Sequence, residues 1–399
     1  MTLKSFPRQE EIALTCRQIL NRIRTVHLRE INGSEGSVLY ISDAYPGVWL
    51  EHVYDGLIWA ELTGENQVAR SYVKLFLKHQ KPDGQLPCYV WRDRVGYSQL
   101  QECVSFASIG LEVFRRTQDR PFLEELYDGC CRWDSWLCAN RLGRAGLLEM
   151  YCGYDSGHDN SGRLDGMKYP GNICEDAAVR PEGCPVAPII APDINAVFYG
   201  DRTALAEMAA LLGREQEALL WRQKAEAVRE SLFRCCYDEA DQFFYDVDRQ
   251  GQPRKCRSIS ITNVFSERVT DPALTAAIFD RYFRSPSEFG TPFPYPSVSA
   301  GDPLFEKRIP GNSWGYYCQG LTMLRTLRWM KAQGLRQELH ENMRKWLTAW
   351  TGASLPFGQE LDPFTGEPSE SSPWYSATML FYLASAKELG LVRDFGQAP

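Results

Sequence analysis

A pattern of paired helices, repeated along the chain, is the feature that most constrains the fold. In each repeat, two segments with apolar residues at helical spacing are joined by only two or three residues, as at Gly64-Glu65 and Gly213-Arg214. Five pairs follow one another, and the unpartnered first and last helices are expected to pair with each other. The expected helices span 8–29, 47–63, 66–80, 98–116, 120–141, 193–212, 215–233, 259–268, 271–283, 313–332, 336–351 and 373–389.

Long connections separate these pairs. Helix pairs that alternate in direction around a ring place every long connection at one end of the ring. The pattern therefore predicts an all-α fold, an (α/α)6 barrel, with one helix of each pair inside and its partner outside. The whole chain, 1–399, is expected to form one domain with its function at the long-loop face. Few strands are expected, apart from a β-hairpin of 243–248 and 255–260 around Gly251.

Composition excludes several function classes. The net charge of −7 and the lack of a basic cluster argue against a nucleic-acid or anionic-membrane partner. No apolar run approaches the roughly 18 residues of a membrane span. The N-terminus lacks the apolar region of a secretory signal, so we expect a cytoplasmic protein. The 13 cysteines are odd in number and include no C-x-x-C pair, which predicts reduced, mostly buried thiols.

The loop 148–165 is the first of two long connections in which acidic residues are concentrated. It carries Asp155, Asp159 and Asp165 among glycine, serine and asparagine, and it has little apolar surface to bury. Polar, glycine-bent loops on a rigid scaffold are where binding and catalysis usually occur. A solvated acidic loop or a calcium site would explain the composition as well.

The last long connection, 355–376, supplies a second set of carboxylates. It contains Glu360, Asp362, Glu367 and Glu370. If the long connections share one end of the barrel, these groups face the loop 148–165. Hydrolysis of a glycosidic bond needs two carboxyl groups flanking the bond, because one protonates the leaving oxygen while the other activates water or attacks directly. The two acidic loops together meet that need.

Other residues expected near this end of the barrel are candidates for sugar binding. Trp49, Trp314 and Trp374 would stack on a sugar ring, although packing in the barrel core explains Trp49 and Trp314 equally well. Glu51 and Asp55 lie one helical turn apart and would share a face. The candidates for contacts to the sugar hydroxyls are Glu51, Asp55, Gln101, Asp155, Arg163 and Tyr317.

Three stretches resemble the motifs of glycoside hydrolase family 63, which includes processing α-glucosidases and mannosylglycerate/glucosylglycerate hydrolases. D-S-G-H-D-N-S-G-R-L-D at 155–165 resembles the family's E-S-G-x-D-N-S-P-R-x-D. E-L-D-P-F-T-G-E at 360–367, followed by P-W-Y-S-A, is similar to E-x-Y-D/N-P-x-T-G and F-x-W-S-A. F-L-K-H-Q-K-P-D-G-Q-L-P at 76–87 is similar to N-Q-x-P-D-G-x-I-P. The resemblance implies a glycoside hydrolase on the (α/α)6 barrel that related trehalases share.

The resemblance also implies catalytic roles. Asp159 occupies the position of the family's general acid, and the implied inverting mechanism needs a carboxylate on the other side of the bond to activate water. Glu360 is the expected base, although strict counting back from Thr365-Gly366 places Gln359 where the family has its glutamate. A base at Glu367 or Glu370 is the alternative.

The sequence departs from the family motif at Asp155, His158 and Gly162, where the family has glutamate, methionine or tryptophan, and proline. These departures leave the subfamily, and therefore the sugar, open.

The combined prediction is an inverting, exo-acting hydrolase for a small α-linked glucoside or mannoside. It needs no organic cofactor and no catalytic metal, and its partner is a small oligosaccharide or glycoside. The oligomeric state, including a homo-oligomer, stays open. One alternative is a sugar epimerase on the same barrel, which would rely on paired histidines where only His158 lies in a candidate loop. The other is a sugar-binding barrel that has lost its base.

Overall fold

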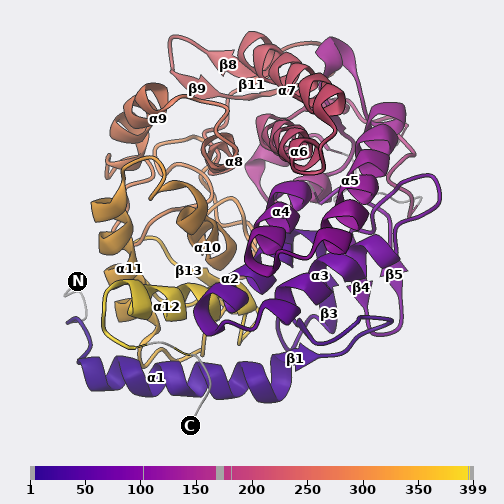
Figure 1. Ribbon diagram of the computed structural model, residues 1–399. Coiled ribbons are helices and arrows are strands. Elements are labelled where there is room, and N and C mark those ends of the chain that lie inside the picture. The colour runs from indigo at the N-terminus through magenta and orange to yellow at the C-terminus, as the bar shows by residue number, and fades with distance from the viewer. Residues whose placement is uncertain (1–4, 102, 168–174, 181, 394, 396–399) are drawn as a thin grey trace.

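The protein folds into a closed double ring of helices. The structure is a computed structural model, and it describes residues 5–101, 103–167, 175–180, 182–393 and 395. Six inner helices contact one another in sequence, and α12 closes the ring against α2 (Figure 1). The inner helices are α2 (Val53–Thr63), α4 (Phe106–Thr117), α6 (Pro192–Leu211), α8 (Ile261–Ser266), α10 (Gly320–Trp329) and α12 (Ser376–Glu388).

Six outer helices surround this ring in the described part of the chain, which confirms the predicted (α/α)6 barrel. The first helix packs on the last, as expected, and the others follow the inner helix that precedes them in the chain. A five-residue π-helical turn, Phe279–Phe283, extends α9, and its Phe283 packs edge-on against Phe265 of α8 at 5.8 Å. The outer helices are α1 (Gln9–Arg22), α3 (Asn66–Lys78), α5 (Arg120–Asn140), α7 (Glu215–Cys236), α9 (Pro272–Ile278) and α11 (Arg336–Trp350).

The pattern of apolar and polar residues in each helix explains whether the helix lies in the inner or the outer ring. Inner helices touch neighbours on every side, and α12 is buried at each residue from 376 to 386. Outer helices are amphipathic: α7 buries Trp221, Val228 and Leu232 and presents charged side chains to solvent.

The short turns between paired helices contain residues that end one helix and cap the next. Gly64, at φ 82°, ends α2, and the Asp119 carboxylate caps α5 by accepting from the Phe122 N–H.

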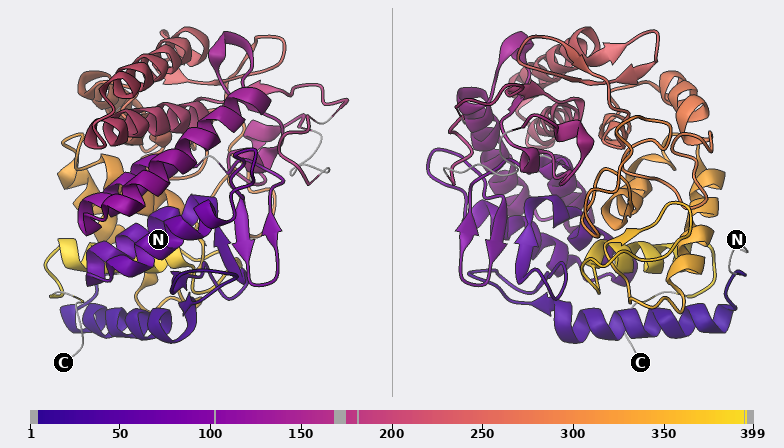
Figure 2. Two further views of the ribbon diagram at one scale, coloured as in Figure 1. Left: turned by 45° about the vertical axis from the view of Figure 1, so that its right-hand side comes forward. Right: turned by 180° about the vertical axis from the view of Figure 1, so that it is seen from behind.

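The long connections gather at the other end of the barrel, where short antiparallel strands join them (Figure 2). A four-stranded sheet has the order β11-β10-β7-β6, and β3, β4 and β5 form a second sheet. β12 pairs with β13, so the connection before α10 is tied to the connection before α12. The strands are β1 (Leu28–Arg29), β2 (Val38–Leu39), β3 (Gly47–Trp49), β4 (Tyr89–Trp91), β5 (Val95–Gly96), β6 (Glu149–Met150), β7 (Ile189–Ile190), β8 (Tyr237–Asp238), β9 (Phe243–Phe244), β10 (Asp246–Val247), β11 (Pro253–Arg254), β12 (Cys318–Gln319) and β13 (Glu360–Leu361).

Two details of the prediction need correction. The expected hairpin exists around Gly251, but its strands are β10 and β11, and residues 255–260 are not in a strand. Five inner helices begin later than expected, at 53, 106, 261, 320 and 376 rather than 47, 98, 259, 313 and 373. The apolar residues before them belong to buried strands and loops, which a short apolar run does not distinguish from helix.

The sequence also predicts that the chain has no membrane span and that its cysteines are reduced, mostly buried thiols. Among the described helices, none is both long and apolar enough to cross a membrane. No disulfide joins the cysteines of the described ranges, and most of these cysteines are buried.

Candidate active site

A cavity of about 240 Å³ opens at the end of the barrel that carries the long connections. Its walls come from segments far apart in the chain, because the connections before α2, α4, α6, α10 and α12 all contribute residues to it. The lining residues are Ile41, Tyr45, Trp49, Glu51, His52, Gln99, Gln101, Tyr154, Gly157, Asp159, Asn312, Trp314, Leu321, Gln359 and Tyr375.

A larger cavity, of about 680 Å³, lies at the opposite end, among the C-terminal ends of the inner helices. Its charged side chains largely pair with one another, as Glu267 does with Arg328 at 2.5 Å. None of the predicted site residues lines it. The 240 Å³ cavity is therefore the candidate active site.

Asp159 lies on the wall of this cavity in a tightly held loop. Its carboxylate Oδ2 accepts a hydrogen bond from Asn312 Nδ2 at 2.9 Å, and its backbone carbonyl accepts from the Trp314 N–H at 2.9 Å. Burial raises the pKa of Asp159 to about 7, and the negative charges of Glu51 and Glu360 add to the increase against the opposing Asn312 hydrogen bond. A substantial fraction of Asp159 therefore carries a proton at neutral pH.

Glu51 shares the cavity with Asp159. It lies in a 3-10 turn, Leu50–His52, directly before α2. Its Oε2 accepts a hydrogen bond from Arg325 Nη2 of α10 at 2.8 Å, and 12% of its side chain is exposed. The loop of Asp159 packs against this group, because a Cβ on Gly157 would lie 3.3 Å from Glu51 Oε2 and 2.7 Å from Cys103 Sγ. Glycine at 157, with φ 69°, permits that approach.

Glu360, the expected base, does not line the cavity. Its side chain is fully buried, and burial raises its pKa against several opposing hydrogen bonds. The backbone N–H groups of Asn312 and Ser313 donate to its carboxylate at 2.8 Å each. Gln319 Nε2 and Ser369 Oγ donate at 2.6 and 2.7 Å.

Gln359, the neighbour of Glu360, is the residue that reaches the cavity from this segment. Its Nε2 donates to Asn312 Oδ1 at 3.0 Å. The alternative bases Glu367 and Glu370 are exposed and lie outside the cavity wall. The catalytic role of Glu360 stays a prediction, and the geometry brings Gln359 beside Asp159 in its place.

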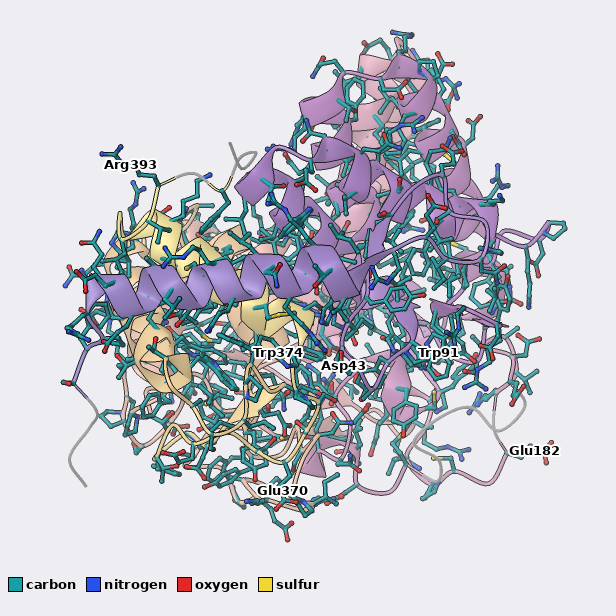
Figure 3. All side chains as sticks on the ribbon, turned by 90° about the horizontal axis from the view of Figure 1, so that it is seen from below. Asp43, Trp91, Glu182, Glu370, Trp374 and Arg393 are labelled. Carbon is teal, nitrogen blue, oxygen red and sulfur yellow. The ribbon has the colours of Figure 1, made fainter. Side chains whose placement is uncertain are left out.

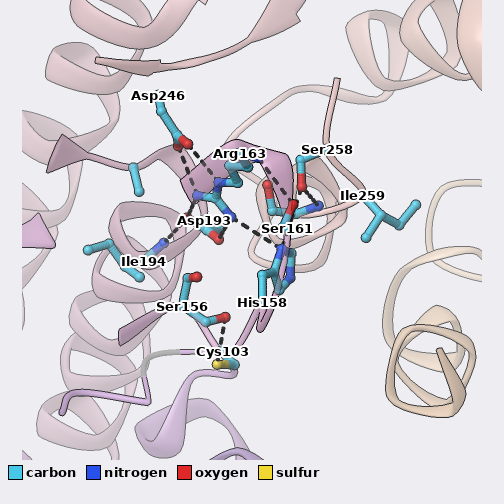
Figure 4. A network of polar contacts seen from close by, with 12 residues as sticks. Cys103, Ser156, His158, Ser161, Arg163, Asp193, Ile194, Asp246, Ser258 and Ile259 are labelled. Atoms are coloured by element: carbon cyan, nitrogen blue, oxygen red, sulfur yellow. Dashed lines mark hydrogen bonds and ion pairs between the residues drawn. The ribbon is translucent and has the colours of Figure 1, made fainter. Parts of the chain in front are cut away.

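Arg163 was expected to bind sugar, and the structure places it in a buried ion-pair network instead (Figure 4). Its Nη1 and Nη2 donate to Asp193 at 2.7 and 2.8 Å, while Nε and Nη2 donate to Asp246 at 2.6 and 2.8 Å. His158 lies beside it, and burial together with the Arg163 charge lowers the pKa of His158 to about 3. His158 is therefore neutral at physiological pH.

Asp155 likewise serves the loop and does not reach the cavity. Its fully buried carboxylate accepts from the backbone N–H groups of Leu100 and Tyr151 at 2.8 Å each, and it forms an ion pair with Arg141. These bonds fix the start of the loop that carries Asp159. Sequence reasoning chose Asp155 because it is acidic, whereas its partners come from connections that only the fold brings together.

Three more of the predicted binding residues lie off the cavity wall. Asp55 accepts from His52 Nδ1 at 3.0 Å, so it orients a lining residue instead of lining the cavity itself. The Tyr317 hydroxyl donates to the Pro310 carbonyl at 3.0 Å. Trp374 lies near α1 and Asp43 (Figure 3), with the Arg22 guanidinium 5.3 Å from its ring.

Besides Glu51, three of the predicted binding residues reach the cavity, namely Trp49, Gln101 and Trp314. Trp49 lies in β3 and Trp314 in the connection before β12, so neither begins an inner helix as expected. One face of Trp314 is stacked on His158, with ring centroids 4.5 Å apart. Gln101 donates through Nε2 to the Tyr154 carbonyl at 3.0 Å, and its buried Oε1 has no hydrogen-bond partner in the described structure.

Sequence reasoning missed several lining residues. Tyr45, Gln99 and Tyr154 come from long connections without a recognisable motif. His52 had a detectable signal, since its three-residue spacing from Asp55 places the two side chains on one face. Tyr375 donates its hydroxyl proton to His52 Nε2 at 3.1 Å when the other ring nitrogen carries the proton.

Within the described ranges, no group of three or more His, Cys, Asp and Glu side chains is placed to hold a metal ion.

Comparison with known proteins identifies the same kind of barrel. Residues 57–378 match a family model described as the mannosylglycerate hydrolase MGH1-like glycoside hydrolase domain. The fold is similar to the family 63 mannosylglycerate hydrolase of Thermus thermophilus in complex with Tris, with a TM-score of 0.73, 17% identity, and coverage of 93% of this chain and 99% of that chain. Structures of that enzyme have also been solved with glucose and with Tris and D-glycerate.

Two further similarities extend this comparison. The neutral trehalase of Saccharomyces cerevisiae has a TM-score of 0.67 and 13% identity, with 95% of this chain and 81% of the trehalase covered. An uncharacterized protein of Borreliella burgdorferi is 25% identical over 126 residues, which is 31% of this chain. That match spans about a quarter of the Borreliella protein, 25% of its length.

Proposed function

This chain belongs to the mannosylglycerate hydrolase MGH1-like glycoside hydrolase family, and we propose that it removes one sugar, with inversion, from a small α-linked glucoside or mannoside. Family membership makes the chain a glycosidase. The substrate, the stereochemistry and the catalytic residues are the proposed part.

The observation that carries the proposal is the Asp159 carboxylate at the cavity wall, where the Asn312 side chain donates to it. A general acid must hold a proton at the working pH and release it to the leaving oxygen in the transition state. Burial and the nearby carboxylates place the pKa of Asp159 at about 7, which suits that task. Its position in D-S-G-H-D-N-S-G-R-L-D is also that of the acid in the motif it resembles.

The cavity supports an exo-acting enzyme for a small substrate. Its volume, about 240 Å³, lies just below the range of roughly 300–1,000 Å³ typical of small-molecule sites. The amide oxygens Oε1 of Gln101 and Gln359 belong to lining residues, are buried, and have no partner in the described structure. Sugar hydroxyls would satisfy both oxygens, and the rings of Trp49 and Trp314 offer apolar surfaces to a sugar.

Inversion requires a second carboxylate that activates water. The motif points to Glu360 as this carboxylate. The hydrogen bonds to Glu360 link it to Asn312, whose side chain donates to Asp159. Loss of the Glu360 charge would therefore disturb the acid even if Glu360 never touches the water.

The experiment is a hydrolysis screen on α-glucosides and α-mannosides, read by proton NMR, with wild type and D159N. We expect wild type to release the β-anomer first and D159N to turn over roughly 10²–10⁴-fold more slowly. Because Asp159 must be protonated, wild-type kcat/KM should fall above about pH 7.

D165N is the matched control for this experiment. Asp165 lies in the same loop and pairs with Arg308. The Asp165 side chain is 50% exposed and the Arg308 side chain 30% exposed, so D165N should keep near wild-type turnover. Equal turnover by D159N and wild type, or binding of the sugars without any release, would contradict the proposal.

A further inference from the structure

Two carboxylates from different connections, Glu51 and Asp159, share the candidate cavity, whereas Glu360 is fully buried behind the cavity wall and does not line it. Resting on the proposed hydrolase function, we infer that Glu51 is the carboxylate that activates the attacking water and that Glu360 is a positioning residue. Glu51 was expected only to hydrogen-bond a sugar hydroxyl.

Gln359 and Glu360 are neighbours, but of the two only Gln359 lines the cavity. Gln359 lies in a bend, and β13 begins at Glu360. Both side chains contact Asn312 and Gln319, and the Glu360 carboxylate is fully buried among its donors. Strict counting in the T-G motif also puts Gln359, which cannot accept a proton as a carboxylate does, at the position of the family's glutamate.

Glu360 has no capacity left for a catalytic water. A carboxylate offers about four hydrogen-bonding positions. Four donors occupy them at 2.6–2.8 Å, namely the N–H groups of Asn312 and Ser313, Gln319 Nε2 and Ser369 Oγ. With its side chain fully buried, Glu360 holds the backbone at 312–313 in place, and Asn312 in turn holds Asp159.

Glu51 has the features that Glu360 lacks. It lines the cavity, and only one of its oxygens, Oε2, is engaged by Arg325, at 2.8 Å. Its Oε1 accepts no hydrogen bond from the described residues, and His52 Nε2 lies 4.0 Å away. The hydrogen bond from Arg325 holds one side of the carboxylate in place and leaves Oε1 available to a water molecule.

Glu51 also acts on the proton of Asp159. Its negative charge is among the causes that raise the pKa of Asp159, after burial. The group that we assign as the base therefore helps to keep the proposed general acid protonated.

The step that follows is balanced in atoms and protons. The water oxygen bonds to the anomeric carbon as the bond between that carbon and the glycosidic oxygen breaks. The Asp159 proton goes to the leaving oxygen, and the water proton goes to Glu51. One water is consumed, and proton exchange with solvent returns Asp159 to its acid form and Glu51 to its carboxylate.

The test compares E51Q with E360Q as a matched pair, in the full chain and on the best α-glycoside from the screen. Each substitution keeps an amide that can hydrogen-bond, and thermal melting checks that each variant folds. E51Q should lower kcat at least about 100-fold and remove the fall of activity at acidic pH, because no base remains to be protonated. E360Q should lower activity less and keep both limbs of the pH profile.

Azide provides a second readout that a structural role would not produce. A small anion can replace water in the space left by E51A and attack without a base. We expect E51A with azide to yield the β-glycosyl azide, and E360A to yield none. E51Q activity within tenfold of wild type with the acidic limb intact, or a glycosyl azide from E360A alone, would overturn the inference. In both cases the proposed hydrolase would stand, whereas a wild type that releases no sugar would overturn both.

Discussion

Arg163, Asp193 and Asp246 form a buried ion-pair network next to the loop that carries Asp159. The arginine satisfies two carboxylates at once, and its side chain is 1% exposed. Burying three charges costs solvation, which is offset only while every member keeps its partner. At the scale of single residues, this explains why a charged side chain in a polar loop can serve the fold instead of the substrate.

The substitution R163Q should destabilise the protein by about 3–5 kcal/mol, because it leaves two carboxylates buried without their cation. Urea denaturation of R163Q and R308Q measures the difference. Arg308 pairs with Asp165 at the surface of the same loop, so R308Q should cost about 1 kcal/mol or less. If R163Q unfolds like wild type and only raises KM, Arg163 binds substrate after all.

The inner helices α10 and α12 approach each other closely at Gly320, the first residue of α10. A Cβ there would lie 2.1 Å from Thr378 Oγ1 of α12 and 3.3 Å from the Gln359 carbonyl. That carbonyl accepts from the Gly320 N–H at 2.8 Å. At the scale of elements, one close contact between helices therefore also fixes the segment that presents Gln359 and Glu360.

We expect G320A to cost about 1–3 kcal/mol of stability, because the added methyl group overpacks this contact. The same substitution in a T378A background should cost clearly less, since the obstructing side chain is gone. A double-mutant cycle read by urea denaturation isolates the coupling. Equal costs in the two backgrounds would show that the strain arises elsewhere.

The ring of six helix pairs gathers carboxylates, and no lysine or arginine, on the described wall of the cavity. Glu51 and Asp159 are the charged lining residues in this part of the chain, and the whole protein has a net charge of −7. Two nearby cations are paired with carboxylates, since Arg308 pairs with Asp165 and Arg325 of α10 pairs with Glu51. At the scale of the whole molecule, the field of the site favours a neutral leaving group over an anionic one.

A matched pair of substrates tests this preference. α-Mannosylglycerol and α-mannosylglycerate differ only in a hydroxymethyl group against a carboxylate on the leaving group. We expect kcat/KM at least about tenfold higher for the glycerol compound, a gap of about 1.4 kcal/mol that should narrow at high ionic strength. A preference for the glycerate compound would reveal a cation that reaches the leaving group.

Local patterns in the chain determined the architecture. Helical periodicity and short turns predicted all twelve helices and their pairing, because the spacing of apolar residues reports directly which side of a helix is buried. The acidic loop 148–165 and the choice of Asp159 within it also came from the sequence. The starts of the inner helices did not, because buried strands and loops there carry the same apolar residues.

Only the tertiary structure decided which polar side chains face the cavity. Glu51 meets Arg325 across 274 residues, and Arg163 meets Asp246 across 83. Gln359 and Glu360 are adjacent in sequence, yet Gln359 lines the cavity and Glu360 is fully buried and does not line it. A polar residue is chemically available only when the fold leaves one of its atoms unpaired at a cavity. That condition depends on distant partners, which local sequence does not specify.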